Sequence, residues 1–223
     1  MIVTIDGPAG AGKSTAAREL ARRLGFEYLD TGAMYRAVTW VCLSRGVDLA
    51  DRDAVAELAS RIRLEFRLGR IFADGSDVSD TIRTTKVTEE SRHVAANLQV
   101  RARLVEMQRE IAGSQNVVTE GRDQGTVAFP LAECKFFLTA DPVERAKRRQ
   151  AELERRGEKI GLEELIVQLG GRDQRDVTRE VGALKRAADA VEFDTSELDA
   201  DSLVLRLEQI VRERMNSRAS AKS

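Results

Sequence analysis

The first 24 residues constrain the fold of this chain more than any other segment. Residues 1–6 form a short apolar, β-branched run typical of a buried strand. Residues 7–14 read Gly-Pro-Ala-Gly-Ala-Gly-Lys-Ser, a full match to the pattern G-x-x-x-x-G-K-[ST]. From Ser14 to Leu24 the apolar residues recur at helical spacing. A strand, a glycine-rich loop and a helix in this order predict the start of an α/β fold.

The glycine-rich loop has the composition of a phosphate-binding site. Its glycines permit backbone conformations that a Cβ would prevent, so successive N–H groups can point at an anion next to a helix N-terminus. Lys13 would reach the β- and γ-phosphates of ATP, and the Ser14 hydroxyl would bind Mg²⁺. The alternative, a turn with a solvated lysine, explains the eight matching positions poorly. The predicted ATP contacts are Gly7, Pro8, Ala9, Gly10, Ala11, Gly12, Lys13, Ser14 and Thr15.

The composition excludes several classes of protein. The 223 residues are 42% hydrophobic and 33% charged with a net charge of −1, so general attraction to nucleic acid or a membrane surface is not expected. Cys42 and Cys134 follow no pattern, which is typical of reduced thiols. No apolar run approaches the roughly 18 residues of a membrane span. We expect a cytoplasmic monomer with small-molecule substrates and without nucleic-acid or membrane partners.

Strand and helix patterns alternate downstream. Apolar runs predict strands at 26–29, 116–119, 133–139 and 190–194, and helical periodicity predicts helices at 33–44, 94–112, 162–176 and 200–214. Asp141-Pro142 begins a further, strongly charged helix with proline in its first turn. This alternation predicts a single α/β domain over 1–223, a parallel sheet flanked by helices. The polar residues 216–223 are expected to form a disordered tail.

Residues 45–95 have a different pattern of apolar and charged residues from the rest of the chain. A helical pattern at 50–60 precedes the alternating apolar and charged residues 62–68, which predict a half-buried antiparallel strand. Turn signals at 69–70 and 74–75 flank the apolar run 71–73. This small β element inside an α/β chain predicts an inserted subdomain.

Two polar segments follow predicted strands at the edge where open α/β sheets bind ligands. The first is Asp30-Thr31-Gly32, in which Asp30 or Thr31 would also cap the next helix. The second is Gly121-Arg122-Asp123, in which Arg122 can hold a phosphate and Asp123 can accept a hydrogen bond. The alternative for Arg122 and Asp123 is a local surface ion pair.

Two charged segments have both a functional and an ordinary explanation. Arg172, Arg175, Asp176 and Arg179 fall on one face of one predicted helix, where either neighbouring aspartates or a polyphosphate would neutralise the cations. The spacing leaves both explanations open. Residues 145–161 would form an arginine-bearing lid, hinged at Gly157 and Gly161. Pairs at i,i+4 such as Glu144–Arg148 and Glu152–Arg156 instead favour an ordinary solvated helix for most of these arginines.

Together these segments resemble bacterial cytidylate kinases, a family of nucleoside monophosphate kinases, in register over nearly the whole chain. Many enzymes share the phosphate loop, so the later segments are what make the resemblance specific to this family. They are Leu29-Asp30-Thr31-Gly32-Ala33-Met34-Tyr35-Arg36, Asp77-Val78-Ser79, Ile82-Arg83-Thr84, Val100-Arg101, Gly121-Arg122-Asp123, Gly125-Thr126-Val127, Phe129-Pro130, Arg172-Asp173, Asp176 and Arg179.

The resemblance implies a P-loop kinase that transfers the γ-phosphoryl group of ATP to CMP or dCMP with Mg²⁺. It implies that residues 45–95 form the nucleoside monophosphate-binding subdomain, and it favours a phosphate clamp at 172–179. The implied substrate-binding residues are Arg36 and Arg122 at the acceptor phosphate, Arg101, Asp123 and Arg179 at cytosine, Arg172 and Asp176 at the acceptor sugar and phosphate, together with Asp30 and Thr31. The implied catalytic residues, which stabilise charge on the transferring group, are Lys13, Arg122, Arg172 and Arg179.

Several positions depart from the family pattern. Glu120 replaces a common aspartate, Gln124 an apolar residue, Arg92 a small hydroxyl residue, and Gly182-Ala183-Leu184 a proline-containing segment. A different acceptor, such as UMP, AMP or shikimate, is the nearest alternative function. A guanine-nucleotide switch is disfavoured, because no asparagine in the chain is followed by lysine as the Asn-Lys-x-Asp motif requires.

Overall fold

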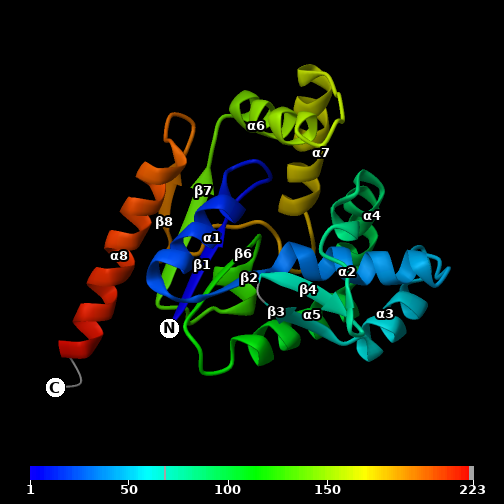
Figure 1. Cartoon of the computed structure of the whole chain (residues 1–223), viewed down its shortest axis with the longest axis horizontal. Helices are drawn as coiled ribbons and strands as arrows, with labels where there is room; N and C mark the ends of the chain where they lie inside the picture. Colours follow the sequence, from blue (N-terminus) through cyan, green and yellow to red (C-terminus); the bar gives the residue numbers. More distant parts are fainter. Residues whose placement is uncertain (68, 221–223) are drawn as a thin grey trace. The chain divides into compact units, whose positions relative to one another are not determined.

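The computed structural model describes residues 1–67 and 69–220, and it divides into two compact units, each treated by itself below. One unit comprises Met1–Tyr28 with Ser114–Ser223, and the other comprises Leu29–Gly113. Among the described residues, no helix combines the length and apolar character needed to cross a membrane. Figure 1 labels the elements along the chain.

The first unit contains most of a five-stranded sheet with the strand order β2-β6-β1-β7-β8, whose strand β2 continues past the unit boundary at Leu29. Its strands are β1 (Ile2–Asp6), β2 (Glu27–Asp30), β6 (Val117–Gly121), β7 (Cys134–Thr139) and β8 (Val191–Asp194). The pairs β1–β6, β1–β7 and β7–β8 are parallel, and helices flank the sheet, as predicted (Figure 1). The register places Asp6 opposite Gly121. The loop after β1 and the turn after β6 therefore leave the sheet at the same edge.

Two helices pack together beside this sheet. α1 (Lys13–Leu24) and α8 (Ala200–Ser220) bury Leu20, Leu207 and Val211 in one core with Val3 and Phe136 of the strands. This apolar burial fixes α1, and with it the loop that precedes α1, against the central strand β1.

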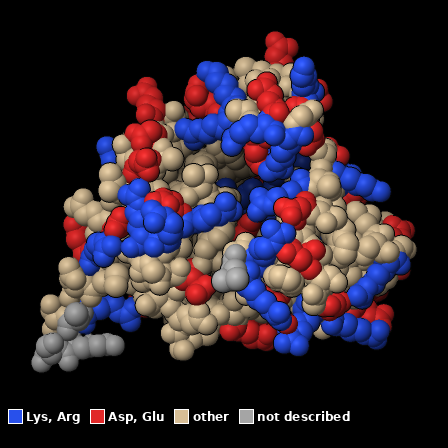
Figure 2. Space-filling view, viewed as in Figure 1, with Lys and Arg blue, Asp and Glu red and all other residues tan. Residues whose placement is uncertain are grey.

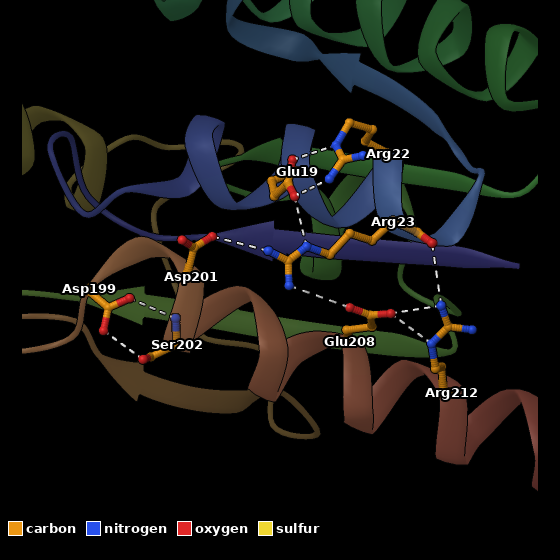
Figure 3. Close-up of polar contacts among 8 residues, drawn as sticks. All are labelled: Glu19, Arg22, Arg23, Asp199, Asp201, Ser202, Glu208 and Arg212. Carbon is orange, nitrogen blue, oxygen red and sulfur yellow. Dashed lines mark hydrogen bonds and ion pairs between the residues drawn. The ribbon is translucent and has the colours of Figure 1, made fainter.

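A network of charges joins the exposed sides of α1 and α8 (Figure 3). The Arg23 guanidinium lies 2.7 Å from Glu19, 3.1 Å from Asp201 and 3.8 Å from Glu208. Arg212 pairs with Glu208 at 2.7 Å, one turn along α8. Exposed pairs of this kind contribute about 0–1 kcal/mol each, so the network adds modest stability and orients α8.

The helices α6 (Pro142–Glu154) and α7 (Leu162–Val177) form a second helix pair in this unit. They pack through Ala146, Leu153 and Leu165. Asp141 caps α6 by accepting the Val143 N–H at 2.7 Å, and proline occupies the first turn as predicted. Basic and acidic side chains intermingle over these helices (Figure 2).

Of the two i,i+4 pairs predicted at 144–156, one is present in the structure. Arg156 pairs with Glu152. Glu144 instead pairs with Lys147 at 2.7 Å, because Arg148 turns away and donates to the Thr195 hydroxyl at 2.9 Å. Arg148 is therefore held inward by a partner that is distant in sequence.

The second unit combines helices with a small antiparallel sheet. α2 (Thr31–Ser44) begins where the Asp30 carboxylate accepts the Ala33 N–H at 2.8 Å, so the predicted aspartate cap is confirmed and the expected turn at 30–32 is the first turn of the helix. α3 (Arg52–Arg61) and the strands β3 (Leu64–Arg67), β4 (Arg70–Ala73) and β5 (Ser76–Asp77) follow. The predicted subdomain at 45–95 falls within this unit, and its nucleotide-binding role stays a prediction.

The single helix predicted at 94–112 is two helices, α4 (Thr85–Ala96) and α5 (Leu98–Ala112), preceded by the short turn η1 (Thr81–Arg83). The helical conformation is interrupted at Asn97, whose side-chain oxygen accepts hydrogen bonds from the N–H groups of Gln99 and Val100. A side-chain cap of this kind starts a new helix although the apolar spacing continues across it.

Two further expectations about helix ends are corrected. α7 ends at Val177, so Arg179 does not share the helix face of Arg172; the Leu184 N–H donates to the Asp176 carbonyl and the chain turns back. α8 continues through Ser220, so residues 216–220 are helical rather than a disordered tail, and Arg218 pairs with Glu133. Residues 221–223 lie outside the described part of the chain.

Candidate active site

The loop at 7–14 has the conformation of an anion cradle. Gly7 has a φ of 148°, and a Cβ there would lie 2.1 Å from the Leu138 carbonyl oxygen, so only glycine fits. Gly12 adopts the left-handed conformation (φ 85°) at the start of α1, where no described side chain caps the helix. The first N–H groups of α1 are thus left to an anion, which the helix dipole also favours.

Lys13 and Ser14 begin α1 with their side chains toward the same edge of the sheet. The Lys13 side chain is 5% exposed, and its Nζ donates to the Pro8 carbonyl at 2.7 Å. Burial and then repulsion by Arg122 lower the pKa of Lys13 to about 7. Ser14 Oγ donates to Glu120 Oε1 at 2.6 Å. The Lys13 amine and a hydroxyl–carboxylate pair between Ser14 and Glu120 of β6 therefore lie at the start of α1.

Arg122 belongs to a buried charge cluster whose ion pairs the sequence did not predict. Its Nε donates to Asp176 Oδ2 at 2.7 Å, while Arg179 Nη2 donates to Asp176 Oδ1 at 2.6 Å. The side chains are only 17%, 7% and 15% exposed for Arg122, Asp176 and Arg179. Burial alone would raise the pKa of Asp176, but attraction by Arg122, Arg172 and Arg179 holds it below its ordinary value. Arg122 therefore takes part in a buried long-range pair, and Asp123 is itself buried, so neither residue is in the exposed setting of a surface ion pair.

The same cluster bears on the two explanations left open for 172–179. Asp176 compensates Arg122 and Arg179 in a buried setting, and Asp173 pairs with Arg145 of α6. Glu120 and Asp173 are further anions near Arg122, while Arg122 and Arg172 are cations near Lys13. The cluster is therefore buried and is not a solvated face, and phosphate binding by it stays a prediction.

Arg145 of α6 contacts the loop and Arg148 lies near it, a placement that was not predicted from the sequence. Arg145 Nη1 donates to the Ala9 carbonyl at 3.1 Å, and a Cβ on Gly10 would lie 2.9 Å from the Arg145 Cβ. Arg148 Nη1 is 4.0 Å from the position of a Gly12 Cβ. The arginine-rich run at 144–156 indicated that some arginines could lie near the loop. Its helical spacing did not show which of them face the loop and which face solvent.

The second unit holds the predicted residues Asp30, Thr31, Arg36 and Arg101, whereas Asp123, which is buried, and Arg172 belong to the first unit. Asp30 and Thr31 start α2, and Arg36 Nη2 lies 3.5 Å from Asp30 Oδ2. Arg36 Nε is buried without a hydrogen-bond acceptor among the described residues, as a phosphate-binding donor would be. The Arg101 guanidinium stacks 5.6 Å from the centre of the Tyr35 ring, and its Nη1 donates to the Ala95 carbonyl at 3.4 Å.

The sequence model of the cytidylate kinase family matches residues 3–213. The chain belongs to the cytidylate kinase family. A cytidylate kinase of Rhodopirellula baltica is 46% identical over 220 residues, covering 99% of this chain and 96% of that protein. A cytidylate kinase of Lactobacillus gasseri is 41% identical over 221 residues, covering 97% and 96%.

Solved structures show the same fold for this cytidylate kinase family member. A shikimate kinase of Bacteroides thetaiotaomicron superposes with a TM-score of 0.50 at 16% identity, covering 95% of this chain and 98% of that chain. This likeness concerns the α/β P-loop architecture alone. Within it, the departure at Glu120 keeps the carboxylate at the Ser14 hydroxyl, and the departure at Gln124 is a buried side chain that accepts the Thr119 hydroxyl at 2.9 Å.

Proposed function

We infer that this chain transfers the γ-phosphoryl group of ATP to CMP or dCMP, giving ADP and CDP or dCDP. A phosphate oxygen of the acceptor forms the new P–O bond as the bond between the β,γ-bridging oxygen and the γ-phosphorus breaks. The observation that carries this inference is the buried cationic group of Lys13, Arg122 and Arg179 beside the phosphate loop, in a chain of the cytidylate kinase family. Phosphoryl transfer depends on such positioning and charge stabilisation.

The donor half of the proposed site is the loop Gly7, Pro8, Ala9, Gly10, Ala11, Gly12, Lys13, Ser14 and Thr15. Mg²⁺ takes oxygen ligands and keeps several waters, so the Ser14 hydroxyl and Glu120 carboxylate, 2.6 Å apart, suit it. Among the described residues no three His, Cys, Asp or Glu side chains form a metal site. Nucleotide phosphates and water would complete the shell, and the ion would offset phosphate charge.

In the acceptor half we propose the family roles named above for Asp30, Thr31, Arg36, Arg101, Arg122, Asp123, Arg172, Asp176 and Arg179. Lys13, Arg122, Arg172 and Arg179 would stabilise the transferring group. The negative charge of bound ATP would raise the pKa of Lys13 from about 7 and keep the ammonium protonated. Residues 145–161 are the proposed lid, and its closure would exclude water that otherwise hydrolyses ATP.

Measuring ADP release with CMP, dCMP, UMP, AMP and shikimate as acceptors tests the proposed function. We expect kcat/KM for CMP or dCMP to exceed the other values by about 100-fold, because buried polar groups left without their partner strongly disfavour a wrong substrate. Preference for UMP, AMP or shikimate, or ADP release that needs no acceptor, would contradict the inference.

Gly32 offers a test of the acceptor half that leaves the fold intact. A Cβ on Gly32 would lie 3.0 Å from Arg36 Nη1 and 3.3 Å from Asp30 Oδ1, so Gly32→Ala should displace the flexible end of Arg36. We expect KM for CMP to rise about tenfold at unchanged thermal stability, because alanine suits a helix. The matched control is Gly170→Ala in α7, where a Cβ meets nothing within 4 Å. Equal CMP kinetics in both variants would remove Arg36 from the site.

A further inference from the structure

Asp6 is a buried carboxylate that the proposed function has not used. It ends β1 directly before the phosphate loop and is 4% exposed. Its Oδ1 accepts the Gln124 N–H at 2.9 Å and its Oδ2 accepts the Gly125 N–H at 2.8 Å. Both oxygens of one carboxylate thus bind two successive backbone N–H groups, immediately after Arg122 and Asp123.

The turn that Asp6 binds is packed closely against β1. A Cβ on Gly125 would lie 3.0 Å from Thr4 Oγ1, 3.2 Å from Lys135 Cδ and 3.4 Å from Asp6 Oδ2. The Asp6–Gly121 register brings β6 to its end at the same level as β1. The backbone that carries Arg122 and Asp123 therefore has little freedom to shift while Asp6 holds it.

The charges around Asp6 come from three elements. Lys13 of α1 attracts it, Asp123 of the turn repels it, and Lys135 of β7 lies beside the same glycine with its Nζ bound to the Pro130 carbonyl and Asp189. Burial raises the pKa of Asp6 to about 6 despite its two N–H donors. At pH 7.5 the carboxylate is ionised, so both oxygens are acceptors.

We propose that Asp6 is a positioning residue whose carboxylate holds the turn after β6 so that Arg122 and Asp123 face the acceptor nucleotide. This role rests on the proposed function. Asp6 touches neither substrate; it acts through the N–H groups of Gln124 and Gly125. Its hydrogen bonds go to the acceptor-side turn, and its interaction with the phosphate loop is the weaker attraction of Lys13, so its loss should affect CMP more than ATP.

The test is Asp6→Asn at pH 7.5. An amide has one acceptor oxygen, so its NH₂ group would face one of the two N–H donors and push the turn away. We expect kcat/KM for CMP to fall about 100-fold, as small misplacements of binding groups do, while the Kd of a non-hydrolysable ATP analogue changes less than threefold. Loss of ATP-analogue affinity to the same extent, or a lower kcat with both KM values unchanged, would overturn the proposal.

Two variants complete the design. Thr4→Val is the matched control, since Thr4 lies on the same strand and face as Asp6 and next to the position of a Gly125 Cβ. Its buried Oγ1 has no hydrogen-bond partner among the described residues, so the kinetics of the variant should equal those of the unmodified protein. Gly125→Ala displaces the turn with Asp6 intact, so it serves if Asp6→Asn does not fold, and it should show the same CMP-selective defect. Unmodified protein without CMP kinase activity would refute the proposed function; an active protein with CMP-unselective variants would refute only the role of Asp6.

Discussion

Replacing Lys13 with methionine should reduce kcat by about 100- to 1,000-fold, the loss found when one donor to a developing charge is removed. Lys13 is the buried cation of the phosphate loop, and its Nζ is already held by the Pro8 carbonyl. Methionine keeps the length and loses the charge, so ATP would still enter while the γ-phosphoryl group loses its nearest stabilising cation. Steady-state ADP release at saturating ATP and CMP measures the effect.

The same variant should be more stable than the unmodified protein in the absence of nucleotide. The pKa of Lys13 is lowered from 10.5 to about 7, so the unfolded chain binds the proton more tightly than the folded chain. Stability of the unmodified protein should therefore rise as the pH increases from 7 toward 10.5. Lys13→Met should lack this rise in urea unfolding. A protein that loses activity and stability together would contradict this explanation.

Lys135→Met is a well-matched control. Lys135 is also a buried lysine, and its Nζ donates at 2.6 Å to the carbonyl of Pro130, five residues earlier, as Lys13 does to Pro8. It also pairs with Asp189 at 3.0 Å, which no phosphate would replace. We expect kcat to stay within twofold and stability to fall, the opposite pattern to Lys13→Met.

Replacing Arg122 with alanine should lower kcat/KM for CMP by about 100-fold or more while the protein remains folded. Arg122 is buried beside Lys13, so it acts where water screens charge weakly. The fold should survive because Asp176 retains Arg179 at 2.6 Å and repulsion on Lys13 decreases. Near-normal CMP kinetics would remove Arg122 from the site.

Replacing Asp176 with asparagine should destabilise the protein, in contrast to Arg122→Ala. The substitution leaves two buried guanidinium groups without their shared anion, which costs about 3–5 kcal/mol when one partner of a buried pair is removed. Inorganic phosphate should restore more stability to this variant than to the unmodified protein, as measured by urea unfolding. The pKa of Asp176 lies below its ordinary 3.8, so its contribution is present above that pH and is lost as the pH falls through the lower folded value.

Local features of the fold were well predicted because their signals lie in adjacent residues. The phosphate loop, the Asp30 cap and the proline-led helix α6 each depend on a few consecutive positions. Predictions failed where a single side chain overrides periodicity: Asn97 divides one apolar pattern into two helices. They also failed where a distant partner competes, as Thr195 does for Arg148.

The sequence by itself determined that this chain binds phosphate and belongs with the cytidylate kinases, since contiguous motifs encode both. Only the tertiary structure decided how the charges pair. Asp176 bridges Arg122 and Arg179, Glu120 meets Ser14, and Asp6 holds the turn at Gln124 and Gly125. Apart from Asp176 with Arg179, these partners are 54 to 119 residues apart. Strand register and helix packing bring them together, and no local pattern of residue types records that register.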